Sequence, residues 1–420
     1  MYRRKPEIMI TNVIVSTRRQ TMLGFAQRVD TMKDSAKVMY DLFHAVTDPR
    51  TINFASGSPA NETLPVDEVR EIAMDVLQKD GRGFEALQYN NPTGILELRQ
   101  IVCDYLLPRR GIEGASPDEV LISTGGLEPL YYACQLFLNP GDTLLVESPT
   151  FMHAVEMFKM FEANCVEVEC DDEGMIIEDL KAKQEKYNAR MVYIIPTFQN
   201  PTGKTMSLER RKAVAELANE RNFIILEDDP YVELRYSGED LPAIKAFDTT
   251  DNVVYANSFS KIFSPGNRLG YIYAAKPIVE KAFDIKTATN SHTAILPHIL
   301  CAEYFKRGFY PQHIADARAF YLDKRDHALA YVKQYMPEGT KVNTPDGGLF
   351  MWLQIPSDKI DTRELLEAAK EKLVAFVAGP GFYIDEGKGL NELRMSYGHL
   401  SYEQLEKGIS ILAELIKERI

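Results

Sequence analysis

A lysine between serines, followed by an arginine, is the most informative group of chemically useful side chains in the sequence. Lys261 lies in SFSKIFSPGNRLG, with Ser258 and Ser260 just before it and Arg268 seven residues further on. Burial or a cationic neighbour lowers the pKa of a lysine, so that its free amine can form a Schiff base. Hydroxyls and a guanidinium can hydrogen-bond a phosphate. Taken alone, these residues fit such a site or a loop with a solvated lysine.

Two further segments place polar groups directly after short apolar runs. Asn200 follows MVYII, where its amide could hydrogen-bond the oxygen of a ring. Asp228, with Tyr231 three residues later, follows FIILE. A carboxylate at the end of a buried strand is costly without a cationic partner, and a protonated pyridine nitrogen would be one. A helix cap or a turn is the alternative explanation for Asp228.

A glycine pair joins the run VLIS to the start of a helical pattern. In this segment Thr124 is followed by Gly125, Gly126 and Leu127. Glycines at such a joint let backbone N–H groups approach a phosphate, which the N-terminus of a helix also favours. A plain tight turn would have the same sequence, so this segment gains meaning only together with the others.

The apolar runs that precede these segments predict the sheet that positions them. Short runs rich in β-branched and aromatic residues recur between residues 120 and 274, mostly separated by stretches of helix length. This alternation predicts an α/β fold with a mostly parallel sheet, whose sites gather at the carboxyl ends of the strands. The runs are VLIST, TLLVE, CVEVE, MVYII, FIILE, VVYAN and GYIYA.

The pattern changes towards both ends of the chain. Residues 301–336 and 401–419 have the charge pattern of long amphipathic helices. We expect a large domain over residues 56–299 and a smaller α+β domain that combines residues 1–55 with residues 300–420.

Composition excludes several classes of function. The 420 residues contain 48 Lys and Arg against 61 Asp and Glu, so the net charge of -13 argues against a nucleic-acid-binding protein. No apolar run reaches 18 residues, so we expect no membrane span, and the basic N-terminal 20 residues lack the pattern of a signal peptide. The five cysteines and seven histidines form no CxxC or HExxH motif. We therefore expect no metal site and a cytoplasmic protein with reduced thiols.

The four segments in this order resemble the fold-type I, pyridoxal-phosphate-dependent aminotransferases of class I and II. The sequence is most similar to the 2-aminoadipate, kynurenine and aromatic aminotransferase group, from about residue 50 to the C-terminus. The resemblance implies a mainly parallel seven-stranded sheet flanked by helices in the cofactor-binding domain. It also implies a ping-pong transfer of an amino group between an L-amino acid and a 2-oxo acid, and a homodimer with shared active sites.

The resemblance assigns the cofactor-binding residues one by one. Lys261 matches the lysine that is joined to the cofactor and later shuttles a proton, and Asp228 matches the partner of the pyridine nitrogen. Asn200 and Tyr231 match groups on the phenolic oxygen, and Phe151 stands where a tyrosine usually stacks on the ring. The phosphate ligands match Arg268, Ser258, Ser260, the turn Gly125-Gly126-Leu127 and, from the partner subunit, the residue equivalent to Tyr89.

The resemblance also implies a clamp for the substrate carboxylate. Arg394, in NELRMSYG, matches the arginine of that clamp, with Asn200 beside it, and Gly57, in FASGSP, matches a backbone contact to the same group. Gly126 and Leu127 replace a Ser-Gln pair that is common in the family, which removes side-chain bonds to the phosphate but keeps the backbone amides.

Two alternatives remain open on these residues. A carbon–sulfur lyase or a decarboxylase would use the same scaffold and the same early steps. A non-catalytic regulator that binds the cofactor is disfavoured because the roughly 50 residues before FASGSP have no basic helix-turn-helix pattern.

Overall fold

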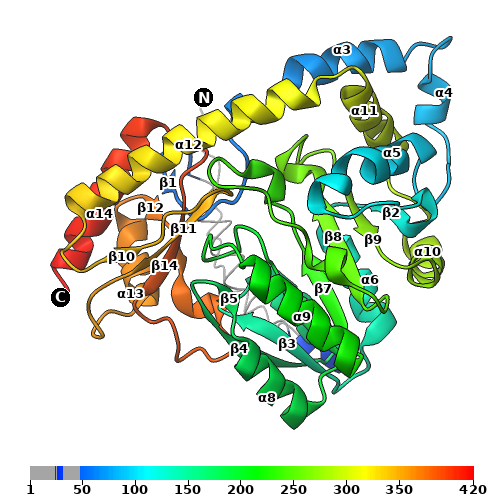
Figure 1. Ribbon diagram of the computed structural model, residues 1–420. Helices are drawn as coiled ribbons and strands as arrows, with labels where there is room; N and C mark the ends of the chain where they lie inside the picture. Colours follow the sequence, from blue (N-terminus) through cyan, green and yellow to red (C-terminus); the bar gives the residue numbers. More distant parts are fainter. Residues whose placement is uncertain (1–23, 25, 32–47) are drawn as a thin grey trace, which may run out of the picture.

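The computed structural model describes residues 24, 26–31 and 48–420 (Figure 1). The interpretation of the basic N-terminal 20 residues, and most of the predicted contribution of residues 1–55, therefore lie outside the described residues. Within the described part, no helix is long and apolar enough to cross a membrane. The same residues contain no group of three or more His, Cys, Asp or Glu side chains arranged to hold a metal ion.

The centre of the molecule is a mixed sheet with the strand order β2-β9-β8-β7-β6-β3-β4-β5. Strands β4, β3, β6, β7 and β8 run parallel, whereas β9 is antiparallel to both β2 and β8, and β5 is antiparallel to β4. The strands are β2 (Val120–Ser123), β3 (Thr143–Ser148), β4 (Asn164–Asp171), β5 (Gly174–Met175), β6 (Met191–Ile194), β7 (Ile224–Asp228), β8 (Val253–Ser258) and β9 (Gly270–Tyr273).

This sheet confirms the α/β class and the mainly parallel arrangement. The seven predicted runs are the seven longer strands, and the two-residue strand β5 is an eighth that is too short to leave an apolar pattern. Strand β9 lies between β2 and β8 although it is the last of them in the chain.

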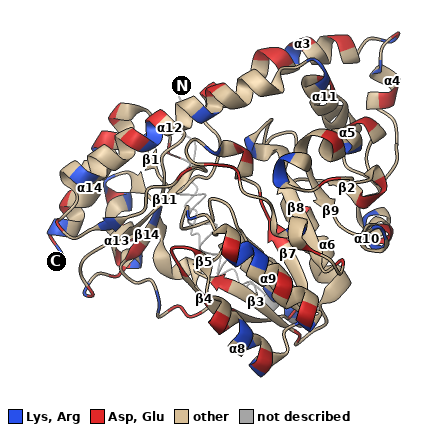
Figure 2. Ribbon diagram, viewed as in Figure 1, with Lys and Arg blue, Asp and Glu red and all other residues tan. Residues whose placement is uncertain are grey.

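Helices cover both faces of the sheet because its strands are apolar on both sides. Leu144 and Val146 of β3 pack into the cluster with α6, α7 and α10, whereas Leu145 points to the opposite cluster with α8 and α9. Charged residues are frequent along α8, α9 and α10, whereas most strand residues are uncharged (Figure 2). The helices are α6 (Leu127–Phe137), α7 (Met152–Met160), α8 (Ile177–Tyr187), α9 (Leu208–Arg221) and α10 (Lys276–Thr289).

A second group of elements surrounds an antiparallel sheet with the order β10-β11-β14-β13. Ile52 and Phe54 share a core with the C-terminal elements, since β1 pairs in parallel with β12. Segments from both ends of the chain thus meet here, while the boundaries at residues 56 and 300 stay a prediction. The elements are β1 (Ile52–Asn53), β10 (Lys341–Val342), β11 (Phe350–Gln354), α13 (Thr362–Glu371), β12 (Val374–Ala375), β13 (Val377–Ala378), β14 (Glu392–Ser396) and α14 (Tyr402–Lys417).

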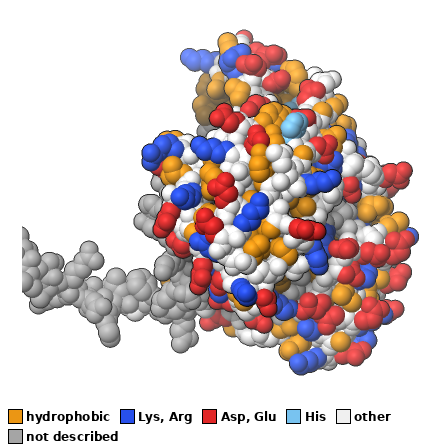
Figure 3. Space-filling model, turned by 90° about the vertical axis from the view of Figure 1, so that its left-hand side faces the viewer, with side chains coloured by type: hydrophobic (Ala, Val, Ile, Leu, Met, Phe, Trp, Pro, Cys, Tyr) orange, Lys and Arg blue, Asp and Glu red, His pale blue; other side chains and the backbone are white. Residues whose placement is uncertain are grey.

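The long helix α12 (Tyr310–Tyr335) runs past both groups of elements (Figure 1). The first half of α12 packs in a core that also contains residues of β2, β8 and β9. Ala328 and Val332, in its second half, pack in the core of the C-terminal elements. On the face in Figure 3, basic and acidic side chains are interspersed. The remaining helices are α1 (Gln27–Asp30), α3 (Val66–Val76), α4 (Gly83–Ala86), α5 (Leu96–Ile101), α11 (Ile295–Lys306) and the short turns η1 (Asn61–Thr63), η2 (Val102–Leu106), η3 (Pro108–Arg110), η4 (Pro117–Glu119), η5 (Val232–Leu234), η6 (Ile244–Phe247), η7 (Phe259–Lys261) and η8 (Gly379–Phe382).

Candidate active site

The carboxyl ends of neighbouring strands bring the polar segments together. Asp228 is the last residue of β7, Ser258 is the last residue of β8, and Asn200 follows β6, which neighbours β7. In a parallel sheet these ends open at one edge, where the side chains can face one ligand. Arg394 reaches the same edge from β14 of the other sheet, since it hydrogen-bonds Asn200.

The turn between β2 and α6 forms a close-fitting cradle. Gly125 has a φ of +78°, and a Cβ at this position would stand 2.0 Å from the guanidinium of Arg268. A Cβ on Gly126 would stand 3.2 Å from the Cβ of Ser258. The backbone at the start of α6 therefore lies directly beside Arg268 and Ser258. A residue larger than glycine would not fit there without a shift of these neighbours.

The donors around this cradle suit a phosphate. The hydroxyl of Ser258 donates to Ser260 Oγ at 2.9 Å, and Ser258 Oγ accepts from the backbone N–H of Ser260 at 3.1 Å. Arg268 is exposed, and its one side-chain hydrogen bond within the described residues goes to the carbonyl of Pro265. The cradle offers a phosphate group hydrogen-bond donors of three kinds. These are two hydroxyls, a guanidinium and the N-terminus of α6 at Leu127, and they fit a phosphate such as that of pyridoxal phosphate.

Lys261 projects from η7, next to this cradle. Its Nζ donates to the carbonyl of Gly57 at 2.7 Å and lies 5.9 Å from the centre of the Tyr231 ring. Burial lowers the pKa of Lys261 to about 8, and the charges of Arg394 and Arg268 act in the same direction. A lysine with this pKa has a substantial neutral fraction near pH 8, so it can react with a carbonyl and exchange protons.

Asp228 is a buried carboxyl with one hydroxyl donor and, in the described part of the chain, no ion-pair partner. Its Oδ2 accepts a 2.8 Å hydrogen bond from the hydroxyl of Tyr193. Burial raises the pKa of Asp228 to about 7, the Tyr193 hydrogen bond lowers it, and neighbouring Asp229 raises it further. A protonated ring nitrogen would supply the missing cation, so the chemistry of this carboxyl fits pyridoxal phosphate.

Arg394 and Asn200 form a charged, hydrogen-bonded unit opposite Lys261. Arg394 donates from Nη1 to Asn200 Oδ1 at 2.8 Å and from Nη2 to the carbonyl of Ala55 at 2.6 Å, and its buried Nε has no acceptor among the described residues. Its guanidinium lies over the ring of Phe350, 4.2 Å from the centroid. Burial lowers the pKa of Arg394 only to about 10, so it stays charged at neutral pH and can bind a carboxylate.

The other predicted residues divide into near and distant ones. Tyr231 is buried, and burial raises the pKa of its phenol although the neighbouring Arg394 and Asn200 lower it. Phe151, just before α7, lies 5.1 Å from the ring of His153 and is partly buried. Tyr89 is 83% exposed, and the ring contact found for it is with His292. It is not among the residues that converge on Lys261 within one chain.

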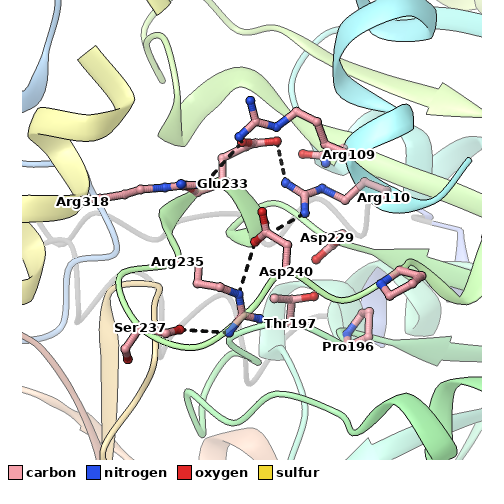
Figure 4. Close-up of polar contacts among 12 residues, drawn as sticks. Arg109, Arg110, Pro196, Thr197, Asp229, Glu233, Arg235, Ser237, Asp240 and Arg318 are labelled. Atoms are coloured by element: carbon pink, nitrogen blue, oxygen red, sulfur yellow. Dashed lines mark hydrogen bonds and ion pairs between the residues drawn. The ribbon is translucent and has the colours of Figure 1, made fainter. Parts of the chain in front are cut away.

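A buried ionic cluster anchors the segment that follows Tyr231 (Figure 4). Glu233 in η5 accepts from Arg110 Nη2 at 2.6 Å and from the hydroxyl of Tyr310 at 2.7 Å, and its backbone carbonyl accepts from Arg318 Nε at 2.7 Å. The positive charges of Arg110 and Arg109 outweigh burial and lower the pKa of Glu233. The cluster fixes this segment against η3 and α12.

Sequence reasoning missed Tyr193 and a second buried group, Glu147 at the end of β3. Glu147 accepts from the backbone N–H of Ile195 at 3.0 Å and from Gln199 Nε2 at 3.4 Å, so it ties the loop before Asn200 to β3. Burial raises the pKa of Glu147 to about 8. The sequence does show Tyr193 as a hydroxyl-bearing residue inside an apolar strand. Its hydrogen-bond partner, however, depends on the order and register of the strands.

Comparisons with known proteins agree with this geometry. The sequence profile of the family "Aminotransferase class I and II" matches residues 49–412. The chain is 37% identical over 401 residues to aromatic-amino-acid aminotransferase 1 of Thermococcus litoralis, covering 94% of each chain, and 31% identical to the 2-aminoadipate transaminase of Thermus thermophilus, covering 91% of this chain and 94% of that one. The crystal structure of Pyrococcus horikoshii kynurenine aminotransferase superposes with a TM-score of 0.88 at 36% identity, covering 94% of this chain and 97% of that chain.

Proposed function

Because this chain belongs to the class I and II aminotransferases and is a pyridoxal-phosphate-dependent transaminase, we propose a specific role for each residue around Lys261. The observation that carries these roles is the buried position of Lys261 Nζ, which donates to the carbonyl of Gly57 and whose pKa is lowered by burial and by the charges of Arg394 and Arg268. The substrates are an amino acid and a 2-oxo acid, and the proposal concerns which groups bind and move their atoms.

Four groups of residues hold the cofactor in this proposal. Pyridoxal phosphate supplies a pyridine ring that accepts the electron pair released when the Cα proton of the substrate leaves. The cradle holds the phosphate, Asp228 keeps a proton on the ring nitrogen, and Phe151 packs on the ring face. Asn200 and Tyr231 hydrogen-bond the ring oxygen. The cradle consists of Ser258, Ser260, Arg268 and the backbone of Gly125, Gly126 and Leu127.

Lys261 and Arg394 act on the substrate. The guanidinium of Arg394 binds the α-carboxylate, assisted by Asn200 and the backbone of Gly57, and so fixes the direction of the Cα–H bond. As a free amine, Lys261 Nζ would remove the proton from the substrate Cα and deliver it to the cofactor carbon, acting as general base and then as general acid. Its lowered pKa suits both directions of this transfer near neutral pH.

We infer that amino acids with aromatic or long side chains are substrates. Three relatives support this class: an aromatic-amino-acid aminotransferase, a 2-aminoadipate transaminase and a kynurenine aminotransferase. The rings of Phe350 and Phe382, 4.2 and 5.2 Å from the Arg394 guanidinium, give the carboxylate site apolar neighbours. Such rings offer contact area to the ring or the carbon chain of an aromatic or long side chain.

We also propose a homodimer in which Tyr89 reaches the phosphate of the partner's site. Helices α3 and α4 precede Tyr89 and expose large apolar side chains that include Met74, Phe84 and Leu87. Exposed apolar groups of this size near one segment are typical of an interface. The five cysteines are all unpaired, which supports the proposed cytoplasmic location.

A panel of L-amino acids with 2-oxoglutarate as acceptor tests the proposal. We expect stoichiometric formation of glutamate and the matching 2-oxo acid, with higher kcat/KM for phenylalanine, tyrosine, kynurenine and 2-aminoadipate than for alanine. Pyruvate and ammonia released from a β-substituted amino acid without any 2-oxo acid would point instead to a lyase. Preference for alanine would contradict the proposed substrate class but not the transaminase activity.

A further inference from the structure

The hydroxyl of Tyr193 makes the one hydrogen bond that the described residues donate to the carboxyl of Asp228. The distance to Oδ2 is 2.8 Å, and both side chains are almost completely buried. The other carboxyl oxygen, Oδ1, receives no hydrogen bond from the described residues and is not among their buried, unpaired polar atoms. Oδ1 is therefore available to a ligand, while Oδ2 is bound by the hydroxyl of Tyr193.

Strand register, not a loop, sets this contact. Tyr193 of β6 lies opposite Leu226 of β7, so Asp228 is the diagonal neighbour two residues further along the same face. The tyrosine ring packs edge-on against Phe158, with a centroid distance of 5.2 Å. The strand position and the packing against Phe158 both restrict the Tyr193 side chain. Its hydroxyl therefore holds the Asp228 carboxyl in one orientation.

The phenol of Tyr193 stays protonated, so its hydroxyl can donate to the ionised carboxyl of Asp228. Burial and the nearby carboxyl raise the pKa of its phenol well above 10. The hydroxyl therefore keeps its proton over the working pH range, and the ionised Asp228 accepts the hydrogen bond. Since Asp228 has a single such donor, removal of that donor changes both the direction and the basicity of the carboxyl.

We propose that Tyr193 is a positioning residue for the cofactor, whose hydroxyl orients the Asp228 carboxyl so that Oδ1 is presented to the pyridine nitrogen. This inference rests on the proposed role of Asp228. It adds to that role a specific strand residue that has no contact with substrate or cofactor itself.

The other groups that face Asp228 act in the opposite direction to Tyr193. Asp229 on the same strand raises the pKa of Asp228, and the buried carboxyl of Glu147 on β3 interacts unfavourably with it. Tyr231 is neutral, because burial raises the pKa of its phenol. Loss of the Tyr193 hydroxyl thus leaves Asp228 a stronger base that competes with the ring nitrogen for their shared proton.

The chain offers a matched control on the adjacent strand. Tyr255 of β8 is also fully buried, and its hydroxyl donates at 3.2 Å to Oδ2 of Asp229, the neighbour of Asp228. Tyr255→Phe and Tyr193→Phe each remove one hydroxyl bonded to a buried aspartate and leave the ring in place. Tyr255→Phe also removes the acceptor of Asn257 Nδ2, at 2.9 Å, so it is at least as large a loss of buried hydrogen bonding. A general effect of losing a buried hydroxyl would appear in both variants.

The experiment is a pH titration of the visible absorbance of the holoenzyme, together with the dissociation constant of pyridoxal phosphate. When the ring carries less positive charge, the nitrogen that joins it to Lys261 becomes more basic. In Tyr193→Phe we therefore expect the absorbance midpoint to rise by at least about 0.5 pH unit and the cofactor to bind about tenfold more weakly. Tyr255→Phe should keep the wild-type midpoint.

The variant Asp228→Asn distinguishes the proposed role of Asp228 from the positioning role of Tyr193. If Asp228→Asn keeps the wild-type activity and spectrum, the proposed role of Asp228 is wrong. If Asp228→Asn is impaired but Tyr193→Phe titrates like the wild type, or if Tyr255→Phe shifts equally, the positioning role of Tyr193 is overturned while that of Asp228 stands.

Discussion

At the scale of single residues, burial lowers the pKa of both Lys261 and Arg394, but only the pKa of the lysine comes close to 7. The pKa of Lys261 falls to about 8 and that of Arg394 to about 10. The same desolvation raises the pKa of Asp228 to about 7. One environment therefore makes the lysine able to exchange protons, leaves the arginine charged, and leaves the aspartate in need of a cation.

Replacing Arg394 with Lys tests the carboxylate clamp. An ammonium cannot donate to Asn200, to Ala55 and to a substrate carboxylate in the geometry of the guanidinium. We expect kcat/KM to fall on the order of 100-fold for every amino acid in steady-state assays, since a buried charge pair is weakened. Arg363→Lys, at an exposed arginine paired with Asp361, is the control. An unchanged kcat/KM in Arg394→Lys would rule out the clamp.

At the scale of elements, short turns at strand ends hold the site, and their backbone geometry matters as much as their side chains. Gly125 and Gly126 let α6 begin beside Arg268 and Ser258. The segment after Tyr231 is fixed by Glu233 in the buried ionic cluster. The cofactor cradle and the ring partners thus depend on two differently built turns.

Gly125→Ala should disrupt the cradle. Its Cβ would stand 2.0 Å from the Arg268 guanidinium, so the arginine must leave its position. We expect the cofactor to bind at least about tenfold more weakly, as measured by equilibrium titration of the apoenzyme. Gly114→Ala is the matched control, because Gly114 also has a positive φ, +71°, but no atom within 4 Å of its Cβ. Equal weakening in both variants would show that backbone strain alone is responsible.

Glu233→Gln should destabilise the fold in a pH-dependent way. The change removes the closer charge partner of the buried Arg110 and leaves it, among the described residues, only the 3.8 Å ion pair with Asp240. At pH 7 we therefore expect the free energy of unfolding, measured by urea denaturation, to fall by about 3 kcal/mol. Because the folded pKa of Glu233 lies below 4.5, its stabilisation is present above pH 4.5 and is lost as the pH falls through the folded value. The difference between wild type and variant should therefore shrink in acid.

Glu185→Gln is the control for this effect. Glu185 pairs with Arg221 at the surface, 3.0 Å apart, and such pairs contribute at most about 1 kcal/mol. A Glu233→Gln variant as stable as Glu185→Gln, or a difference that does not depend on pH, would show that the cluster does not anchor η5.

Much of the element scale could be predicted from the sequence, because apolar runs and strand-end residues are local signals. The runs became the seven longer strands. Asn200 follows β6, and Asp228 and Ser258 end β7 and β8, so the three residues lie at the carboxyl ends of three adjacent strands. Strand order is not local: β9 inserts between β2 and β8, and β3 lies between β6 and β4. No pattern within a strand encodes those neighbours.

Sequence reasoning missed Tyr193 and Glu147 because their contacts depend on the order of the strands. Tyr193 meets Asp228 only through the register of β6 with β7, and Glu147 meets Gln199 only because β3 neighbours β6. Arg394 could be placed only by resemblance, since β14 belongs to a separate sheet whose approach to Asn200 leaves no trace in spacing.

At the scale of the whole molecule, the site depends on contacts between distant parts of the chain. Arg394 hydrogen-bonds Asn200 and Ala55, which lie 194 and 339 residues away in sequence. The long helix α12 packs in the cores of both groups of elements. Tyr89 stays exposed within one chain, which suits the proposed role in a partner's site.

Mixing two defective variants tests the shared site. A heterodimer of Lys261→Ala and Tyr89→Ala has one site with both defects and one site with neither, if Tyr89 serves the partner's cofactor. After the purified variants are unfolded and refolded together, we expect transaminase activity clearly above the sum of the two homodimers. Activity equal to that sum, with heterodimers shown by native mass spectrometry, would place Tyr89 in the site of its own chain.

The central claim is that Lys261 is the residue joined to pyridoxal phosphate. Reduction of the holoenzyme with borohydride, followed by peptide mass spectrometry, tests it directly. The account predicts a phosphopyridoxyl group on the peptide that contains Lys261, and loss of both the group and transaminase turnover in Lys261→Ala. A phosphopyridoxyl group on another lysine of the wild-type enzyme, or an active and labelled Lys261→Ala variant, would contradict it.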